Sequence, residues 1–249
     1  MPEKKIESPV EHKVAIVTGG TRGIGKAIAA RLIAEGLKVA ICGTRTKSVD
    51  DAVAALSAGN AGPGGEVFGM VADISRQSDV KRFVAAVRER FGSIGILVNN
   101  AGVGVFRSVA DLAPEDWERM IGLNLSGVYY CCHEVLPIMC AAGGGDVINI
   151  SSLAGKNAFA GGAGYNASKF GLNGFSEAMM LDHRNEGIRV SCIMPGSVDT
   201  EFGGEAGSDA DWKIAPSDLA EVVVTLLKMP RRTMVSRVEI RPSRPGGKR

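Results

Sequence analysis

Long apolar runs are absent from the sequence, since no stretch reaches the roughly 18 consecutive apolar residues that a transmembrane helix needs. The first residues, MPEKKIESPVEHK, mix both charge signs and lack the apolar segment of a secretory signal peptide. An excess of one charge is also missing: 29 Lys and Arg residues face 27 Asp and Glu residues, whereas proteins that bind nucleic-acid phosphates are usually strongly basic. We therefore expect a soluble, cytoplasmic protein that binds neither membranes nor nucleic acid.

Cysteine and histidine do not occur in metal-binding patterns. The histidines His12, His133 and His183 show no ligand spacing. The cysteines are odd in number, lie in apolar segments and form no C-x-x-C pair, which indicates reduced thiols and predicts no metal site. They are Cys42, Cys131, Cys132, Cys140 and Cys192.

Glycine is abundant, with 33 residues in 249, or about twice the usual share of ~7%. Without a collagen-like period, this excess indicates tight turns and places where the backbone approaches a ligand closely. The content of 45% hydrophobic and 22% charged residues excludes disorder for the bulk of the chain. A chain of this length fits one large α/β domain.

Short runs rich in Val and Ile alternate with longer amphipathic runs, a pattern typical of a parallel sheet covered by helices on both faces. We predict a single doubly wound, Rossmann-type α/β domain with seven strands over residues 13–240, a tail at 1–12 and a basic, solvated tail at 241–249. The predicted strands are Val14 to Val17, Val39 to Cys42, Val67 to Val71, Ile94 to Val98, Val147 to Ile150, Ile188 to Ile193 and Val235 to Ile240. The predicted helices are Gly23 to Glu35, Ser48 to Ala58, Arg76 to Phe91, Pro114 to Ala141, Tyr165 to Glu186 and Ser217 to Lys228.

A glycine-rich turn, TGGTRGIG from Thr18 to Gly25, joins the first predicted strand to the first helix. Its glycines let the backbone approach a pyrophosphate, and the N–H groups of the helix N-terminus favour a negative charge there. A plain tight connection between strand and helix is the alternative interpretation. A nucleotide-triphosphatase loop is disfavoured because Ala27 stands where such a loop needs Ser or Thr to hold magnesium.

The second predicted strand ends in Cys42-Gly43-Thr44-Arg45, without the acid that usually meets the ribose of NAD. Arg45 and Arg22, which lies in the glycine turn, favour a cofactor with a 2′-phosphate, because guanidinium groups bind phosphate through charge-assisted hydrogen bonds. The sequence therefore favours NADPH over NADH. Two ordinary surface arginines are the alternative.

Polar groups gather where the central strands end. Tyr165 and Lys169 are four residues apart at the start of a predicted helix and so lie on one face. Ser151 and Ser152 follow the fifth strand, and the segment from Asn99 to Gly102 follows the fourth. Open α/β sheets bind ligands at this edge.

With these motifs in order, the chain resembles the classical branch of the short-chain dehydrogenase/reductase superfamily over almost its whole length. The resemblance rests on TGGTRGIG, Asp73, Asn99 to Gly102, Asn124, Ser152, Tyr165-x-x-x-Lys169 and the segment Pro195 to Thr200. It implies that Asn124, Ser152, Tyr165 and Lys169 are catalytic. It also implies cofactor contacts from Gly19, Thr21, Arg22, Gly23, Ile24, Gly25, Thr44, Arg45, Asp73, Asn100, Ala101, Gly102, Tyr165, Lys169, Pro195, Gly196, Val198 and Thr200.

These residue types suit hydride transfer to a carbonyl carbon, which leaves negative charge on the oxygen. Tyr165 would give a proton to that oxygen and Ser152 would hold it, while the charge of Lys169 would lower the pKa of the phenol. In the family, the lysine also holds the nicotinamide ribose, and the asparagine matching Asn124 anchors a water that relays protons to it.

The substrate is open at this point. The segment EFGGEAGSDADWKIA, between Thr200 and Pro216, occupies the place of the family's substrate loop. We expect an NADP(H)-dependent carbonyl reductase acting on a small carbonyl or alcohol. The first alternative is a 3-oxoacyl-carrier-protein reductase, although those chains usually end in a strand containing Gly-Gly, and the second is a cofactor-binding sensor without catalysis. Family likeness and the long helices predict a homodimer or homotetramer.

Overall fold

The structure, a computed structural model, describes residues 13–59, 61–202 and 211–244. The predicted N-terminal tail, residues 203–210 of the predicted substrate loop and the last five residues of the predicted basic tail lie outside the described residues. No helix of the described chain is long and apolar enough to cross a membrane.

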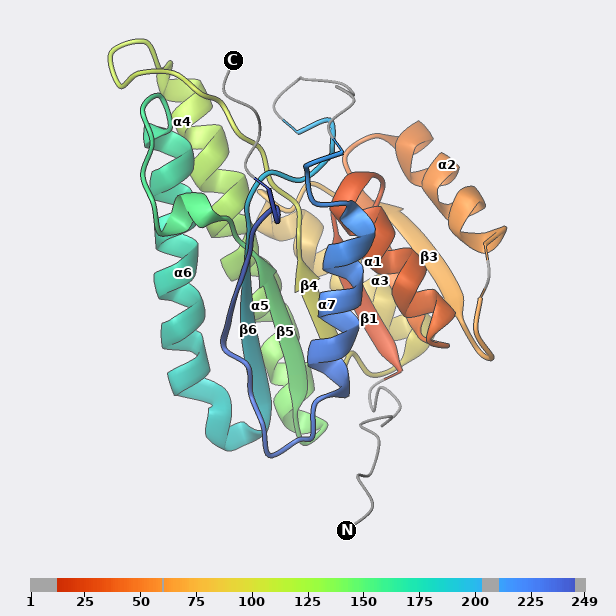
Figure 1. Ribbon diagram of the computed structural model, residues 1–249. Coiled ribbons are helices and arrows are strands. Elements are labelled where there is room, and N and C mark those ends of the chain that lie inside the picture. Colours follow the sequence, from red (N-terminus) through yellow and green to blue (C-terminus); the bar gives the residue numbers. More distant parts are fainter. Residues whose placement is uncertain (1–12, 60, 203–210, 245–249) are drawn as a thin grey trace.

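Seven parallel strands form one sheet, as the sequence pattern predicts, and their order in the sheet is β3-β2-β1-β4-β5-β6-β7 (Figure 1). Chain order reverses between β1 and β4, where Val17 pairs with Ile41 on one side and Val98 on the other. A reversal of this kind opens a crevice at the carboxyl ends of the strands. The strands are β1 (Val14–Thr18), β2 (Lys38–Gly43), β3 (Glu66–Val71), β4 (Ile96–Asn99), β5 (Gly145–Ile150), β6 (Ile188–Pro195) and β7 (Arg237–Ile240).

Helices cover both faces of the sheet. In Figure 1, α1 and α7 cross in front of it and α3 and α5 lie behind it. The helices are α1 (Gly23–Ala34), α2 (Thr46–Ser57), α3 (Gln77–Phe91), α4 (Pro114–Ile121), α5 (Gly127–Ala141), α6 (Ala163–His183) and α7 (Pro216–Lys228), with single-turn elements η1 (Gly122–Ser126), η2 (Leu153–Gly155) and η3 (Arg184–Glu186).

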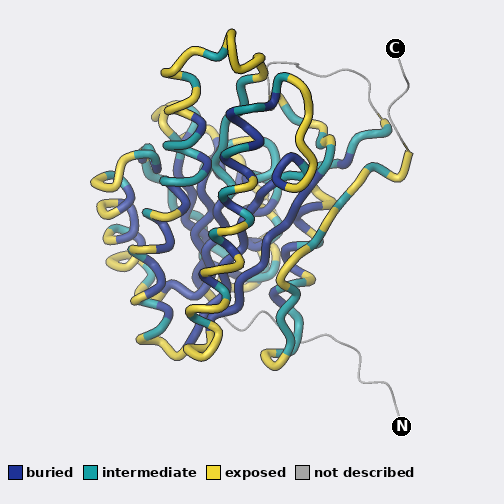
Figure 2. Tube along the Cα trace, turned by 90° about the vertical axis from the view of Figure 1, so that its left-hand side faces the viewer, coloured by how far each residue is buried: buried dark blue, intermediate teal, exposed yellow. Residues whose placement is uncertain are grey.

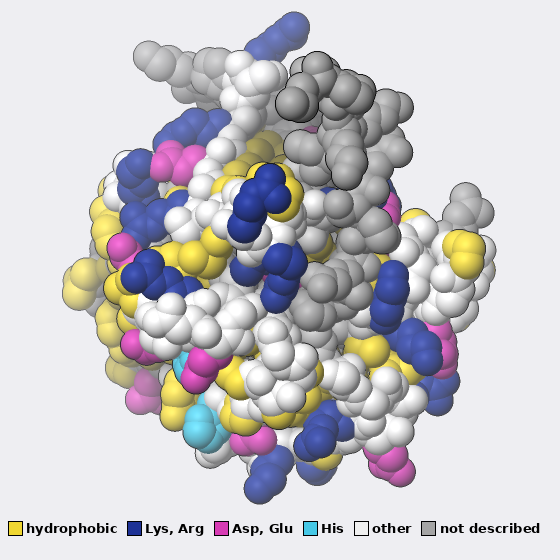
Figure 3. All heavy atoms as spheres, turned by 90° about the horizontal axis from the view of Figure 1, so that it is seen from below, with side chains coloured by type: hydrophobic (Ala, Val, Ile, Leu, Met, Phe, Trp, Pro, Cys, Tyr) yellow, Lys and Arg dark blue, Asp and Glu magenta, His cyan; other side chains and the backbone are white. Residues whose placement is uncertain are grey.

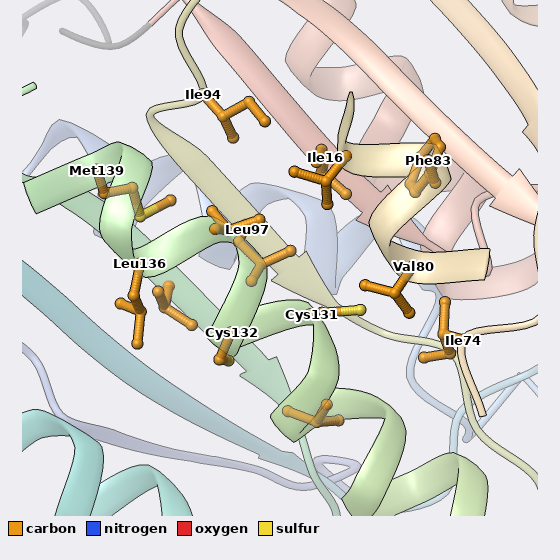
Figure 4. Close-up of a cluster of buried hydrophobic side chains, with 14 of the residues drawn as sticks. Ile16, Ile74, Val80, Phe83, Ile94, Leu97, Cys131, Cys132, Leu136 and Met139 are labelled. Atoms are coloured by element: carbon orange, nitrogen blue, oxygen red, sulfur yellow. The ribbon is translucent and has the colours of Figure 1, made fainter. Parts of the chain in front are cut away.

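Two apolar layers fill the space between helices and sheet. One layer joins α1, α2 and α7 to the sheet, and the other joins α3, α5 and α6 to its opposite face. Figure 2 shows the buried strands at the centre and the exposed residues on the outer sides of the helices. The second layer, shown in Figure 4, includes Cys131 and Cys132. Burial raises the pKa of Cys132 to about 12, so this thiol is a packing group and not a nucleophile.

The predicted helix from Pro114 to Ala141 is three elements, because a π-helical turn, η1, separates α4 from α5. A π turn inserts one extra residue into a helix and escapes a search for the 3.6-residue period. This turn carries Asn124, so the departure from regular helix falls at a predicted catalytic residue.

Most other boundaries agree with the prediction within a few residues. The strand predicted from Ile94 begins at Ile96, because Ile94 is a fully buried core residue that precedes the ladder with β1. The last strand begins at Arg237 and not at Val235, since pairing with β6 starts at Cys192. In both cases the apolar run extends beyond the hydrogen-bonded ladder.

Candidate active site

The glycine-rich turn packs directly against the end of β4. Gly19 has a φ of +63°, and a Cβ atom there would lie 2.9 Å from the Cα of Ala101. The backbone N–H groups of Asn100 and Ala101 donate to Thr18 Oγ1 at 3.0 and 3.1 Å, and Asn100 Nδ2 donates to the Thr18 carbonyl at 3.0 Å. Gly25 has a packing role, because its Cβ would lie 2.3 Å from the Gly19 carbonyl.

A cavity of about 1080 Å³ opens at the carboxyl ends of the central strands. All but two of the predicted site residues line it. These are Gly19, Thr21, Arg22, Gly23, Ile24, Thr44, Arg45, Asp73, Asn100, Ala101, Gly102, Ser152, Tyr165, Lys169, Pro195, Gly196, Val198 and Thr200. Gly25 and Asn124 lie behind the wall, and sequence reasoning did not separate residues that line the site from residues that support it.

The walls of this cavity suit a dinucleotide. The first turn of α1 faces it without a side-chain cap, so its N–H groups are free to meet a pyrophosphate. Arg45 is exposed and has no ion-pair partner among the described residues. Arg22, which also lines the cavity, pairs with Glu201 at 2.7 Å. Asp73 accepts hydrogen bonds from the N–H and hydroxyl of Ser75, so it shapes its own loop as well as lining the cavity.

Ser152, Tyr165 and Lys169 meet at the end of β5. Ser152 caps η2 by accepting a hydrogen bond from the Ala154 N–H at 3.1 Å, which fixes its side chain beside the cavity. Lys169 Nζ lies 5.8 Å from the centre of the Tyr165 ring and donates to the Ile150 carbonyl at 2.9 Å. Three polar groups, one from the segment after β5 and two from α6, therefore share one corner of the cavity.

The neighbouring serine has a different partner. The hydroxyl of Ser151 donates to Asn173 Oδ1 of α6 at 2.5 Å. This bond engages Ser151 with a helix, whereas Ser152 carries the hydroxyl that meets Tyr165. The resemblance to the family also implies Ser152 and not Ser151, which agrees with this geometry.

The pKa of Tyr165 departs from the expectation drawn from the sequence. Burial raises this pKa above its usual value, and a hydrogen bond with Ser152 opposes the rise only in part. Burial also lowers the pKa of Lys169 to about 8, and its ammonium donates to the Ile150 carbonyl. The chain's own groups thus keep the phenol protonated at neutral pH.

Asn124 links the π turn to the catalytic helix. Its Oδ1 accepts from the Val103 N–H at 2.9 Å, and its Nδ2 donates to the Val103 carbonyl at 2.8 Å and to Ser168 Oγ at 3.0 Å. With 1% of its surface exposed, it is a satisfied buried amide. Its side chain therefore holds the loop after β4 against α6.

Three phenylalanines line the cavity around or beside Tyr165, and of these only Phe202 was expected from the sequence to contribute to a substrate pocket. The ring of Phe106 meets that of Tyr165 edge-on with centroids 5.6 Å apart, and Phe202 lies 5.7 Å from it on another side. Phe159 packs against Phe106 at 5.7 Å. They lie in irregular segments, so no periodicity marked them, although Phe202 falls in the segment predicted as a substrate loop.

A doubly wound sheet with a dinucleotide-sized cavity and a Ser–Tyr–Lys corner defines an oxidoreductase of the nicotinamide-dependent class. The chain belongs to the short chain dehydrogenase family, whose model matches residues 13–211. The predicted family and fold are thereby confirmed.

Relatives in this family differ in the substrates for which they are named. A 3beta-hydroxysteroid dehydrogenase from Mediterraneibacter gnavus is 35% identical over 206 residues, 82% of this chain and 73% of that protein. A 3-oxoacyl-[acyl-carrier-protein] reductase from Synechocystis sp. is 35% identical over 190 residues, 76% of each chain. Equal identity to both means that overall likeness does not select a substrate.

Among solved structures, a metagenomic short-chain oxidoreductase in complex with NADP superposes with a TM-score of 0.82 at 36% identity. The match covers 96% of this chain and 100% of that one.

Proposed function

We propose that the protein is an NADP(H)-dependent carbonyl reductase in which Tyr165 exchanges a proton with the substrate oxygen. The observation that carries the proposal is the corner of the cavity that Ser152, Tyr165 and Lys169 line together, with Lys169 Nζ 5.8 Å from the centre of the Tyr165 ring. NADPH, when bound, supplies the hydride. The residues lining the cavity fit this cofactor, since they combine a glycine turn, an uncapped helix N-terminus and Arg45, which has no ion-pair partner in the described part of the chain.

Each polar group of the corner has a distinct task. Tyr165 is protonated at neutral pH and gives its proton to the oxygen that becomes an alkoxide. Ser152 holds that oxygen by a hydrogen bond, and the positive charge of Lys169 stabilises the phenolate left behind. Asn124 positions α6 through Ser168 and keeps the corner in register with the loop after β4.

Preference for NADPH follows from Arg45. It lines the cavity just beyond β2, where an acid would repel a 2′-phosphate. Because it has no ion partner among the described side chains, it binds phosphate without breaking an existing pair. The solved relative in complex with NADP supports the same choice.

The substrate we propose is a bulky, apolar ketone or aldehyde. The rings of Phe106 and Phe202 flank the phenol that must meet the carbonyl oxygen, and Phe159 extends this aromatic wall. Rings of this kind bind flat apolar or aromatic groups by burial and by edge-to-face contact. The reacting carbonyl is therefore expected on an aromatic or alicyclic skeleton.

A carrier-bound 3-oxoacyl thioester is the second candidate, favoured by one observation. Lys213 and Arg241 line the cavity in addition to the aromatic wall, and cations at a cavity mouth suit a phosphopantetheine arm. Arg241 is paired with Glu239 at 3.0 Å, which weakens this argument.

The test is NADPH oxidation with a panel containing an aryl ketone, a cyclic ketone, an aliphatic aldehyde and a 3-oxoacyl thioester. Tyr165→Phe keeps the ring and removes the proton donor, so turnover falls at least about a hundredfold while NADPH binding persists. Tyr129→Phe, on an exposed ring of α5, is the matched control. Unchanged turnover in Tyr165→Phe refutes the mechanism, and tight NADPH binding without turnover of any substrate points to a sensor.

Assembly into a dimer or tetramer is part of the proposal. Phe170 and Leu181 of α6 are 46% and 53% exposed, which is unusual for large apolar side chains. Burying them between two copies of the chain removes this surface from water. Sedimentation showing only monomer at micromolar concentration contradicts the assembly without touching the catalytic proposal.

A further inference from the structure

At the end of the molecule opposite the cavity, three side chains of different chemistry converge. Cys140 Sγ donates to Glu186 Oε2 at 3.2 Å, and His183 Nδ1 lies 2.6 Å from the same oxygen. One ligand atom from each residue lies within 4.8 Å of the others. Cys140 and His183 are partly buried and Glu186 is exposed.

The fold explains why residues separated by more than forty positions meet here. Cys140 lies in the last turn of α5, His183 ends α6 and Glu186 ends η3. These elements lead into β5 and β6, which are neighbours that begin in register, Gly145 opposite Ile188. The two helix ends are therefore held side by side by the sheet. Figure 3 views the molecule from this side, where charged and histidine side chains lie at the surface.

We propose that Cys140, His183 and Glu186 form a binding site for one Zn²⁺-class divalent transition metal ion. Sulfur, imidazole nitrogen and carboxylate oxygen are the donors that zinc takes in proteins, and water completes the fourth position of its tetrahedron. Tetrahedral zinc sets its donor atoms roughly 3.3–3.5 Å apart. The present separations require adjustments of about an ångström in side chains at the surface.

Binding converts the Cys140 thiol to a thiolate and releases its proton to solvent, while His183 binds as the neutral imidazole. The ion would join the end of α5 to the end of α6, and so brace the approaches to β5 and β6. Gly145 and Ile150 are five residue steps apart along β5, so at ~3.3 Å per step the site lies more than ~15 Å from the catalytic corner. Its role is structural and independent of hydride transfer.

The other thiols of the chain compete little with Cys140 for the metal ion. The remaining cysteines, Cys42, Cys131, Cys132 and Cys192, are buried in the core or the sheet, whereas Cys140 is partly exposed. A thiolate–metal signal from the folded protein therefore reports Cys140. Replacement of this one residue tests the assignment directly.

The experiment is titration of the reduced, full-length, tag-free protein with Co²⁺, followed by displacement with Zn²⁺. We expect one ion per chain and the near-ultraviolet charge-transfer band that only thiolate ligation gives. Cys140→Ser abolishes the band, and His183→Gln weakens binding at least about tenfold. His133→Gln, on the exposed face of α5, is the matched control and binds as the wild type does.

Thermal unfolding gives a second readout. Zinc at about a hundredfold excess over its Kd raises the Tm of the wild type and of His133→Gln by roughly 5 °C, and leaves Cys140→Ser unchanged. Circular dichroism of each variant without metal checks that it is folded. Metal binding that saturates equally in Cys140→Ser and in the wild type overturns the proposed site. So does the absence of saturable binding at metal concentrations below ~100 μM, the weak limit for a three-ligand site.

Discussion

Replacing Lys169 by Met separates the catalytic value of this residue from its cost to stability. Burial lowers the pKa of Lys169 from 10.5 to about 8. At about 1.4 kcal/mol for each pKa unit, keeping the ammonium charged in the folded protein costs roughly 3 kcal/mol. Methionine removes this cost and forfeits the hydrogen bond to the Ile150 carbonyl, worth about 1 kcal/mol. The variant is expected to gain about 2 kcal/mol at pH 6.5 and to lose turnover.

The gain depends on pH with a defined sign. Because the folded-state pKa lies below the unfolded value, the unfolded chain binds more protons between about pH 8 and 10.5, and wild-type stability rises with pH across that window. The advantage of Lys169→Met therefore shrinks by about 2 kcal/mol between pH 6.5 and 9.5.

Urea unfolding at the two pH values measures both quantities, and Lys81→Met, on the exposed side of α3, is the control for loss of a surface charge. A variant that is less stable than the wild type at pH 6.5, or a difference that is equal at the two pH values, refutes the reasoning.

Three further substitutions test the cavity. Arg45→Ala is expected to lower the preference for NADPH over NADH, measured as the ratio of kcat/KM values, by about 10- to 100-fold through loss of a charge-assisted phosphate bond; an unchanged ratio contradicts the assignment. Glu201→Gln frees Arg22 from an exposed ion pair and lowers the KM for NADPH by at most about fivefold, whereas a rise in KM argues against it. Phe159→Ala reduces kcat/KM for an aryl ketone about tenfold and spares a small aliphatic aldehyde, and equal losses for both count against the aromatic wall.

The fold was predictable because its elements carry local signals. Buried parallel strands appear as short runs of Val and Ile, and the predicted set matches all seven strands. The errors occur where apolar residues continue past the hydrogen-bonded ladder, as at Ile94, which is buried in a connection. The π turn at Asn124 was missed because an added residue shifts the helical period without changing composition.

Site residues were predictable where a sequence motif with fixed spacing marks them. Properties that depend on how side chains pack in the folded protein were not predictable. Tyr165 and Lys169 were found through their spacing and their resemblance to family motifs. The direction in which the pKa of Tyr165 shifts was not predicted, because it depends on how deeply the phenol and the ammonium are buried. The Cys140–His183–Glu186 cluster likewise follows from the alignment of β5 with β6, which leaves no trace in local spacing.

The two buried groups of the catalytic corner predict opposite pH dependences for the two directions of reaction. In the proposed mechanism, reduction needs a protonated Tyr165 phenol and a charged Lys169 ammonium. The phenol stays protonated because burial raises its pKa, whereas Lys169 loses its proton near pH 8. The kcat/KM for NADPH, which reports the free enzyme, should therefore fall as pH rises through about 8. Alcohol oxidation needs the phenolate, whose population rises with pH, so its optimum lies on the alkaline side of the reduction optimum. A kcat/KM for NADPH that is flat from pH 6.5 to about 9 would mean that the charge of Lys169 is not required.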